Sequence, residues 1–136
     1  MIHQIEIKLP EFNRGYHLIT GTIEKELSQL PQKGILHVFI QHTSAGLTIN
    51  ENADPSVRKD FNSFIDELIP EHHPSYTHIF EGADDMPAHL KASIIGPSVT
   101  IPVTNGRLNL GTWQGIYLCE FRNYGGRRRL ILSVYG

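Results

Sequence analysis

The sequence predicts a single α+β domain over residues 1–136, a mostly antiparallel β-sandwich with two to three inserted helices. Three observations support this fold class. Alternating apolar and polar residues, typical of half-buried strands, recur from the first residues to the last. Two segments in the middle of the chain have helical spacing and end at proline or glycine. The length suits one domain with a substantial hydrophobic core.

The first third of the chain is expected to supply two short β segments, a helix and a central strand. Apolar alternation ends at Pro10, a turn follows at residues 13–15, and Pro31 stops the helical spacing. A continuous apolar run then favours a strand that is buried on both faces. The expected elements are strands at residues 2–9, 16–19 and 35–41 and a helix at residues 19–30.

The clearest helix covers residues 55–68, because Asp54 can cap it, Pro55 suits its first position and Pro70 closes it. A strand-like piece and a second helix, which opens at Pro87 and ends before Pro97, come next. The remainder reads as β structure. Its expected features are strands at residues 99–103, 108–110, 116–121 and 130–135, the strand-like piece at 77–80 and a hairpin at Asn105-Gly106.

Composition narrows the function classes. The net charge of −2 argues against a general nucleic-acid or membrane surface, and no apolar run is long enough to span a bilayer. The single cysteine, Cys119, lies in a strand pattern and is interpreted as a buried, inert thiol in a cytoplasmic protein without a signal peptide. Residues 127–129 are all arginine, which favours a solvated edge strand over a phosphate clamp.

The segment from His42 to Asp54 is the first candidate site. It lies between a predicted strand and a predicted helix, and it carries more hydroxyl, amide, imidazole and carboxylate groups than a plain connection needs. His42, His78 and His89 each stand where a regular element meets a polar turn. Three imidazoles with one open position can bind a divalent metal, usually zinc. The alternative is that these histidines cap helices and form hydrogen bonds.

Two further groups accompany the histidines. Either Asp84 or Asp85 can cap the helix at Pro87, and the other can orient a histidine at a metal or hold Mg²⁺ against a phosphorylated ligand. Thr112, Trp113 and Gln114 lie between two glycines that interrupt a strand pattern. They can line a pocket for a planar heterocycle, or Trp113 can be a core residue at a bulge.

Four separated motifs together resemble the YjbQ family, described as secondary thiamine-phosphate synthases. They are QHTSAGLTINENADP at residues 41–55, YTH at 76–78, EGADDMPAHLK at 81–91 and GRLNLGTWQGIYL at 106–118. The resemblance implies a homotrimer with sites near subunit interfaces. It also implies a synthase that joins 4-amino-2-methyl-5-hydroxymethylpyrimidine diphosphate to thiazole phosphate and releases pyrophosphate, with the native substrate left open.

The resulting hypothesis assigns a role to each candidate residue. The small phosphorylated substrate would be held with a divalent metal, Mg²⁺ or Zn²⁺. Two other functions stay open, a zinc-dependent hydrolase of a small phosphorylated or cyclic metabolite and a non-catalytic trimer that binds a small molecule. The assigned residues are His42, His89, Asp84 and Asp85 for catalysis, His42, His78 and His89 for metal binding, and Thr43, Asn50, Thr112, Trp113 and Gln114 for substrate binding.

Overall fold

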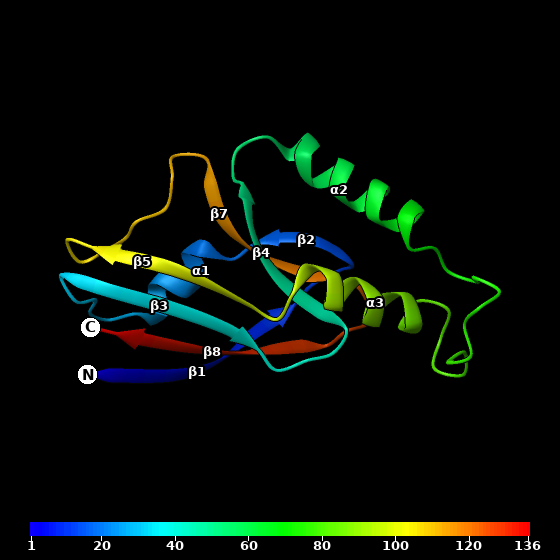
Figure 1. The fold of residues 1–136 in the computed structure, drawn as a ribbon, viewed down its shortest axis with the longest axis horizontal. Coiled ribbons are helices and arrows are strands. Elements are labelled where there is room, and N and C mark those ends of the chain that lie inside the picture. Colours follow the sequence, from blue (N-terminus) through cyan, green and yellow to red (C-terminus); the bar gives the residue numbers. More distant parts are fainter.

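Two antiparallel sheets and three helices form the fold in a computed structural model that describes all 136 residues (Figure 1). The five-stranded sheet contains, in order, β1 (Ile2–Glu11), β8 (Arg127–Tyr135), β3 (Lys33–Ile40), β5 (Ser98–Thr104) and β6 (Arg107–Leu108). The three-stranded sheet has the order β2 (Gly15–Leu18), β7 (Gln114–Glu120) and β4 (Ala45–Glu51). The helices are α1 (Thr20–Glu26), α2 (Pro55–Leu68) and α3 (Asp85–Ile95). The predicted α+β class is confirmed.

The main core lies between the two sheets. Leu36 of β3 and Leu132 of β8 meet Leu47 of β4 and Leu118 of β7 there, all fully buried. The other face of the three-stranded sheet is covered by α2 and α3, which bury Tyr117 and Cys119 of β7. Because β7 is hidden on both faces, its sequence is a continuous apolar run rather than an alternating one.

Cys119 is fully buried, and this burial raises the pKa of its thiol well above the ordinary range. The prediction that this thiol is buried is therefore confirmed. No helix in the structure is both long enough and apolar enough to cross a membrane.

Helix α2 begins as predicted. The Oδ1 atom of Asp54 accepts a hydrogen bond from the backbone N–H of Ser56 at 2.9 Å, and Pro55 occupies the first turn. Phe61 of this helix packs on Tyr16 of β2, with ring centroids 5.6 Å apart. The helix therefore lies on the three-stranded sheet, as Figure 1 shows.

Four local predictions are wrong. The segment from His42 to Asp54, expected to connect a strand to a helix, contains strand β4 (Ala45–Glu51), which pairs with β7. Residues 77–80 pair with no strand and belong to the long loop between α2 and α3. The first helix ends at Glu26, and Leu27 and Leu30 pack against the core from the loop that follows. Residues 127–129 belong to β8, which lies between β1 and β3 instead of at an edge. In each case the local structure depends on contacts with distant parts of the chain, which the local sequence does not encode.

A buried ion pair joins the two sheets. Glu120 at the end of β7 and Arg128 in β8 are both almost fully buried. The Nε atom of Arg128 donates to Oε1 of Glu120 at 2.7 Å, and its Nη2 donates to Oε2 at 2.5 Å. The same Nη2 also donates to the hydroxyl of Ser44 at 3.0 Å. Arg128 therefore anchors the turn that carries His42 and Thr43.

A second ion pair joins α3 to α2, because the buried Nζ of Lys91 lies 2.5 Å from Oδ1 of Asp66. Arg14 donates to the same oxygen at 2.8 Å. Burial by itself would raise the pKa of Asp66, but the hydrogen bonds from Lys91 and Arg14 outweigh it and hold the pKa below the ordinary value. The ionised carboxylate is thus the form that the fold stabilises.

Because the carboxylate of Asp66 is stabilised in its ionised form, we expect the folded protein to lose stability in acid. A carboxyl group with a lowered pKa in the folded state stabilises the fold fully above its unfolded pKa of about 3.9, and the contribution disappears as the pH falls through the folded value. We expect Asp66→Asn to lower the free energy of unfolding in urea at neutral pH. The difference from the unsubstituted protein should shrink at about pH 2.5, below the unfolded pKa. An equal difference at both pH values would contradict this role.

Candidate functional site

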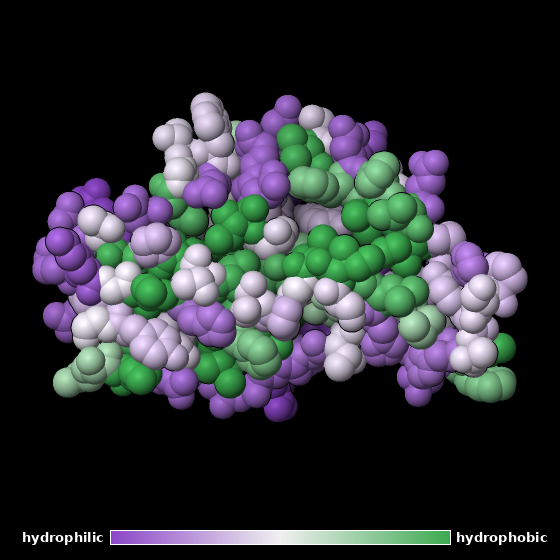
Figure 2. Space-filling view, viewed as in Figure 1, coloured by the Kyte–Doolittle hydropathy of each residue, from purple (hydrophilic) through white to green (hydrophobic).

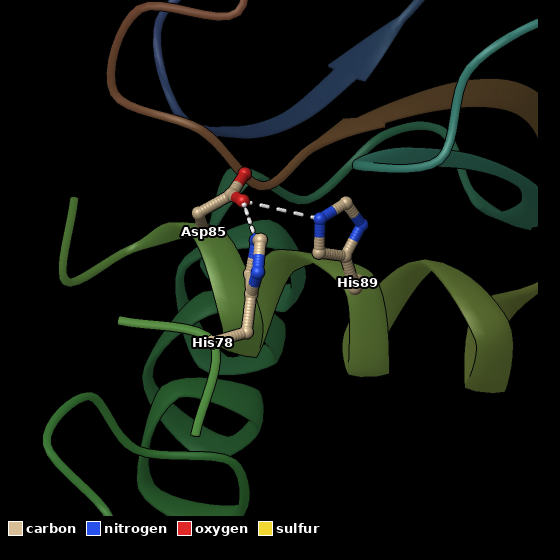
Figure 3. A group of neighbouring side chains, drawn as sticks. All are labelled: His78, Asp85 and His89. Carbon is tan, nitrogen blue, oxygen red and sulfur yellow. Dashed lines mark hydrogen bonds and ion pairs between the residues drawn. The ribbon is translucent and has the colours of Figure 1, made fainter. Parts of the chain in front are cut away.

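The side chains of His78, Asp85 and His89 converge at the start of α3 (Figure 3). Their ligand-type atoms all lie within 4.8 Å of one another. Asp85 is the first residue of α3, and His89 stands one helical turn later on the same face. His78 comes from the loop that precedes the helix. We call these three residues the His-Asp-His group.

Asp85 is the centre of this group. Its side chain is only 2% exposed, and its Oδ2 atom lies 2.6 Å from Nε2 of His78 and 3.1 Å from Nε2 of His89. Its other oxygen accepts a hydrogen bond from Nη1 of Arg122. Burial alone would raise the pKa of Asp85, but His78 and the positive charge of Arg122 outweigh it, so the pKa lies below the ordinary value. A carboxylate anion therefore faces two imidazole nitrogens.

The tautomer of His89 shows what this arrangement requires. Its Nδ1 atom lies 3.0 Å from the carbonyl oxygen of Thr43, and a carbonyl can only accept a hydrogen bond. Nδ1 must therefore carry the proton, and in a neutral ring Nε2 is then an acceptor. That acceptor faces the carboxylate of Asp85 at 3.1 Å. Two acceptors at this distance need a cation between them, either a second proton on the ring or a metal ion.

Asp84 has a different role from Asp85. Its Oδ2 atom accepts hydrogen bonds from Nε of Arg122 and from the backbone N–H of Asn123, each at 2.9 Å. Burial would raise the pKa of Asp84, but these hydrogen bonds outweigh it and lower the pKa. Asp84 stands at the helix start without a side-chain capping bond, so the prediction that one of the two aspartates caps this helix is wrong.

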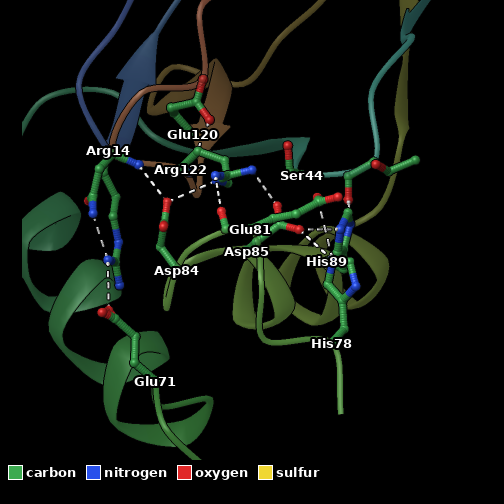
Figure 4. A network of polar contacts seen from close by, with 12 residues as sticks. Arg14, Ser44, Glu71, His78, Glu81, Asp84, Asp85, His89, Glu120 and Arg122 are labelled. Atoms are coloured by element: carbon green, nitrogen blue, oxygen red, sulfur yellow. Dashed lines mark hydrogen bonds and ion pairs between the residues drawn. The ribbon is translucent and has the colours of Figure 1, made fainter. Parts of the chain in front are cut away.

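Arg122 is a residue of the candidate site that the sequence analysis did not predict. It contacts both Asp84 and Asp85 and also donates through Nη2 to the carbonyl oxygen of Glu81 at 3.0 Å (Figure 4). In this way it fixes the loop on one side of the His-Asp-His group. The only signal in the sequence was a lone arginine after the last buried residues of β7, which has no spacing relation to the aspartates.

His42 does not join the His-Asp-His group within one chain. Its Nε2 atom accepts a hydrogen bond from the backbone N–H of Arg129 at 2.8 Å. Burial lowers the pKa of the His42 ring, and the charge of Arg128 lowers it further, so the ring is held neutral with its proton on Nδ1. His42 therefore presents a hydrogen-bond donor rather than a metal ligand. It lines a shallow hollow that it shares with Thr43 and His89.

Four of the remaining predicted residues lie at the other end of β4. Asn50 is paired with Gly115, next to Thr112, Trp113 and Gln114, whereas Thr43 precedes the first residue of the strand. Seven residues of extended chain span roughly 20 Å, so one chain cannot bring the two sets to one small ligand. The Trp113 side chain is 64% exposed, which excludes the alternative that it is a core residue at a bulge.

The whole chain matches one protein family. The family model described as UPF0047 protein YjbQ-like covers residues 3–136. The UPF0047 protein YjbQ of Salmonella typhimurium is 49% identical over 138 aligned residues, which cover 100% of this chain and 99% of that protein. The chain belongs to the YjbQ-like UPF0047 family. A member from Synechocystis is 48% identical and covers 98% of this chain and 92% of its own length.

Solved structures agree with this assignment. A conserved hypothetical protein from Thermus thermophilus is 36% identical, with a TM-score of 0.80 over 95% of this chain and 97% of that one. A YbjQ-like protein of unknown function from Sulfolobus solfataricus has a TM-score of 0.86 over 100% of this chain and 98% of that one. It is 24% identical, so it supports the fold alone. The resemblance to the YjbQ family read from the four motifs is confirmed.

Proposed function

We propose that this protein is a metal-dependent enzyme for a small phosphorylated substrate, and that it has thiamine-phosphate synthase activity. The observation that carries the proposal is the convergence of the carboxylate of Asp85 with Nε2 of His78 and Nε2 of His89. The hydrogen bond to the carbonyl of Thr43 fixes the proton of the His89 ring on Nδ1, so its Nε2 is free to bind an ion. Two imidazoles and one carboxylate are a donor set that suits Zn²⁺, and they leave an open position for substrate.

The residues of the site have separate tasks. His78, Asp85 and His89 would hold the ion, which when bound would stabilise negative charge developing on the departing pyrophosphate. The carbonyl of Thr43 orients the His89 ring. Arg122 and Asp84 brace Asp85, so that its Oδ2 atom stays directed at both rings.

The proposed site is completed by a second copy of the chain in a homotrimer. The position of Asn50, Thr112, Trp113 and Gln114 at the far end of β4 supports this, since exposed residues at that end can face the His-Asp-His group of a neighbour. Figure 2 shows apolar surface over α2 and α3. Phe64 and Leu68 of α2 and Ile94 of α3 are large apolar side chains that are exposed in the single chain. Apolar surfaces of this kind mark protein contact surfaces. A cytoplasmic location belongs to the same proposal.

A zinc-dependent hydrolase is the second candidate. The observation that favours it is the donor set itself, because two histidines and one carboxylate with an open position also occur in hydrolytic zinc sites. Metal content distinguishes the two functions. Near-stoichiometric zinc in protein purified without chelators or a histidine tag, together with hydrolysis and no requirement for Mg²⁺, would favour the hydrolase.

The synthase assay supplies the pyrimidine diphosphate and the thiazole phosphate, with Mg²⁺ or Zn²⁺, and measures thiamine phosphate and pyrophosphate. We expect His78→Ala to lower kcat/KM at least about 100-fold, because ligand loss should exceed the 10- to 100-fold effect of residues that only support a metal ligand. His3→Ala is the matched control, since His3 is exposed on β1. Full activity of folded His78→Ala protein would contradict the site. A wild-type protein inert with either metal would contradict the synthase function and favour a non-catalytic binding trimer.

A further inference from the structure

Two basic side chains face each other on the exposed side of the five-stranded sheet. Lys8 of β1 is the register partner of Arg129 of β8, and both side chains are exposed. Like charges directly opposite each other across an antiparallel pair are destabilising. Neither residue has a carboxylate within 4.0 Å, although acidic residues outnumber basic ones in the chain. The pair is therefore not neutralised by a salt bridge, although Glu6 lies two residues before Lys8 on the same face of β1.

Arg127 adds a third positive charge in a fixed position. Its Nε donates to the carbonyl oxygen of Leu9 at 2.9 Å, and its Nη2 donates to that of Lys8 at 3.1 Å. These bonds occur where the register of β1 and β8 shifts between Lys8 and Glu11. They use two of the five N–H donors of a guanidinium and leave the others free. The backbone thus holds this guanidinium in place without neutralising it.

The three cations line one hollow together with Glu6, Gln41 and His42. No hydrophobic residue lines this open hollow, which has a volume of about 500 Å³. His42 also lines the second hollow, beside Thr43 and His89. The ring of His42 is thus a common wall between the cations and the His-Asp-His group. Its Nε2 atom accepts a hydrogen bond from the backbone N–H of Arg129, which fixes the ring beside that cation.

We propose that Lys8, Arg127 and Arg129 form a binding site for the phosphate group of a phosphate monoester. Free donors that surround a hollow, with a guanidinium held by the backbone, suit the tetrahedral oxygens of phosphate. This site deepens the proposed function and rests on it for the role of its ligand. The phosphate of one substrate would lie among the three cations while the rest of the molecule extends past His42 toward the metal.

Glu6 gives the proposal a second test. Its carboxylate lines the same hollow and would repel a bound phosphate. Glu6 lies two residues before Lys8 on the same face of β1, so it faces any anion held by Lys8 and Arg129. Removing its charge should therefore strengthen phosphate binding, whereas a role as a structural partner of the cations would predict no gain.

Titration calorimetry with metal-free protein tests the site directly, with inorganic phosphate and phenyl phosphate as probes. We expect Lys8→Ala and Arg129→Ala each to weaken phosphate binding about tenfold, as loss of a charge-assisted hydrogen bond predicts. Glu6→Gln should tighten it a few-fold. Lys33→Ala, which removes an exposed lysine at the other end of the sheet, should change nothing.

The two probes separate the possible sources of the anion. Tighter binding of phenyl phosphate than of inorganic phosphate supports a phosphate monoester, and equal or weaker binding overturns that part of the proposal. Unchanged binding in Lys8→Ala and Arg129→Ala, or loss of binding in His78→Ala, would overturn the site. These results are independent of the proposed function, because phosphate binding is measured without metal or turnover.

Discussion

Replacing Asp85 with asparagine is expected to lower the affinity for zinc by at least about 100-fold, since outer residues that only support a ligand already contribute 10- to 100-fold. The substitution keeps the size of the side chain but removes the charge that faces Nε2 of His78 and of His89. It also leaves Arg122 without one of its two carboxylates. The measurement is competition with a zinc-binding dye.

Asp60→Asn is the control for this substitution, because Asp60 is exposed on α2, outside the His-Asp-His group. It should bind zinc as the unsubstituted protein does. A folded Asp85→Asn protein with the same zinc affinity as the control would contradict the assignment of Asp85 as a ligand.

Glu120→Ala is expected to reduce the free energy of unfolding by about 3–5 kcal/mol, because it leaves the buried guanidinium of Arg128 unpaired. Unfolding in urea, followed by circular dichroism, measures the loss. Replacing both partners with apolar residues, Glu120→Leu with Arg128→Met, should recover most of it, since the uncompensated charge is then gone. The partly exposed pair of Arg14 and Glu71, whose charged atoms are 3.7 Å apart, supplies the control, and Glu71→Ala should cost less than about 1 kcal/mol.

The same ion pair connects stability to the site. Arg128 holds the hydroxyl of Ser44, and the carbonyl of the adjacent Thr43 orients the ring of His89. Glu120→Ala protein that is still folded should therefore also bind zinc less tightly. A stability loss below about 1 kcal/mol, as for a surface pair, would contradict the buried role of Glu120.

Local signals predicted the parts of the fold that local interactions determine. Asp54 and Pro55 mark the start of α2 because a capping carboxylate and a fixed proline φ act within one turn. Apolar alternation or continuous apolar runs predicted β1, β3, β5, β7 and β8 for the same reason, but β4 was not predicted. The sequence also predicted a strand at residues 77–80, which pair with no strand in the structure. Which strands pair depends on tertiary structure, and the sequence of a single segment does not determine it.

The candidate site was predicted in its residue types but not in its connections. Asp85 and His89 are four residues apart, and they would have been placed on one helical face if the helix had been started at Asp85 instead of Pro87. The bond from Arg129 to His42, which leaves His42 outside the group, joins residues 87 positions apart. Arg122 reaches Asp85 across 37 positions. No periodicity in the sequence reports contacts of this kind.

The central claim is that His78, Asp85 and His89 bind one divalent ion. Anomalous diffraction at the zinc edge, from crystals grown with zinc, tests it most directly. We expect one peak at about 2.0–2.2 Å from Nε2 of His78, Nε2 of His89 and a carboxylate oxygen of Asp85. Zinc bound elsewhere, for example at His42 or at the exposed His72 and His73, with no peak at the His-Asp-His group, would contradict the claim.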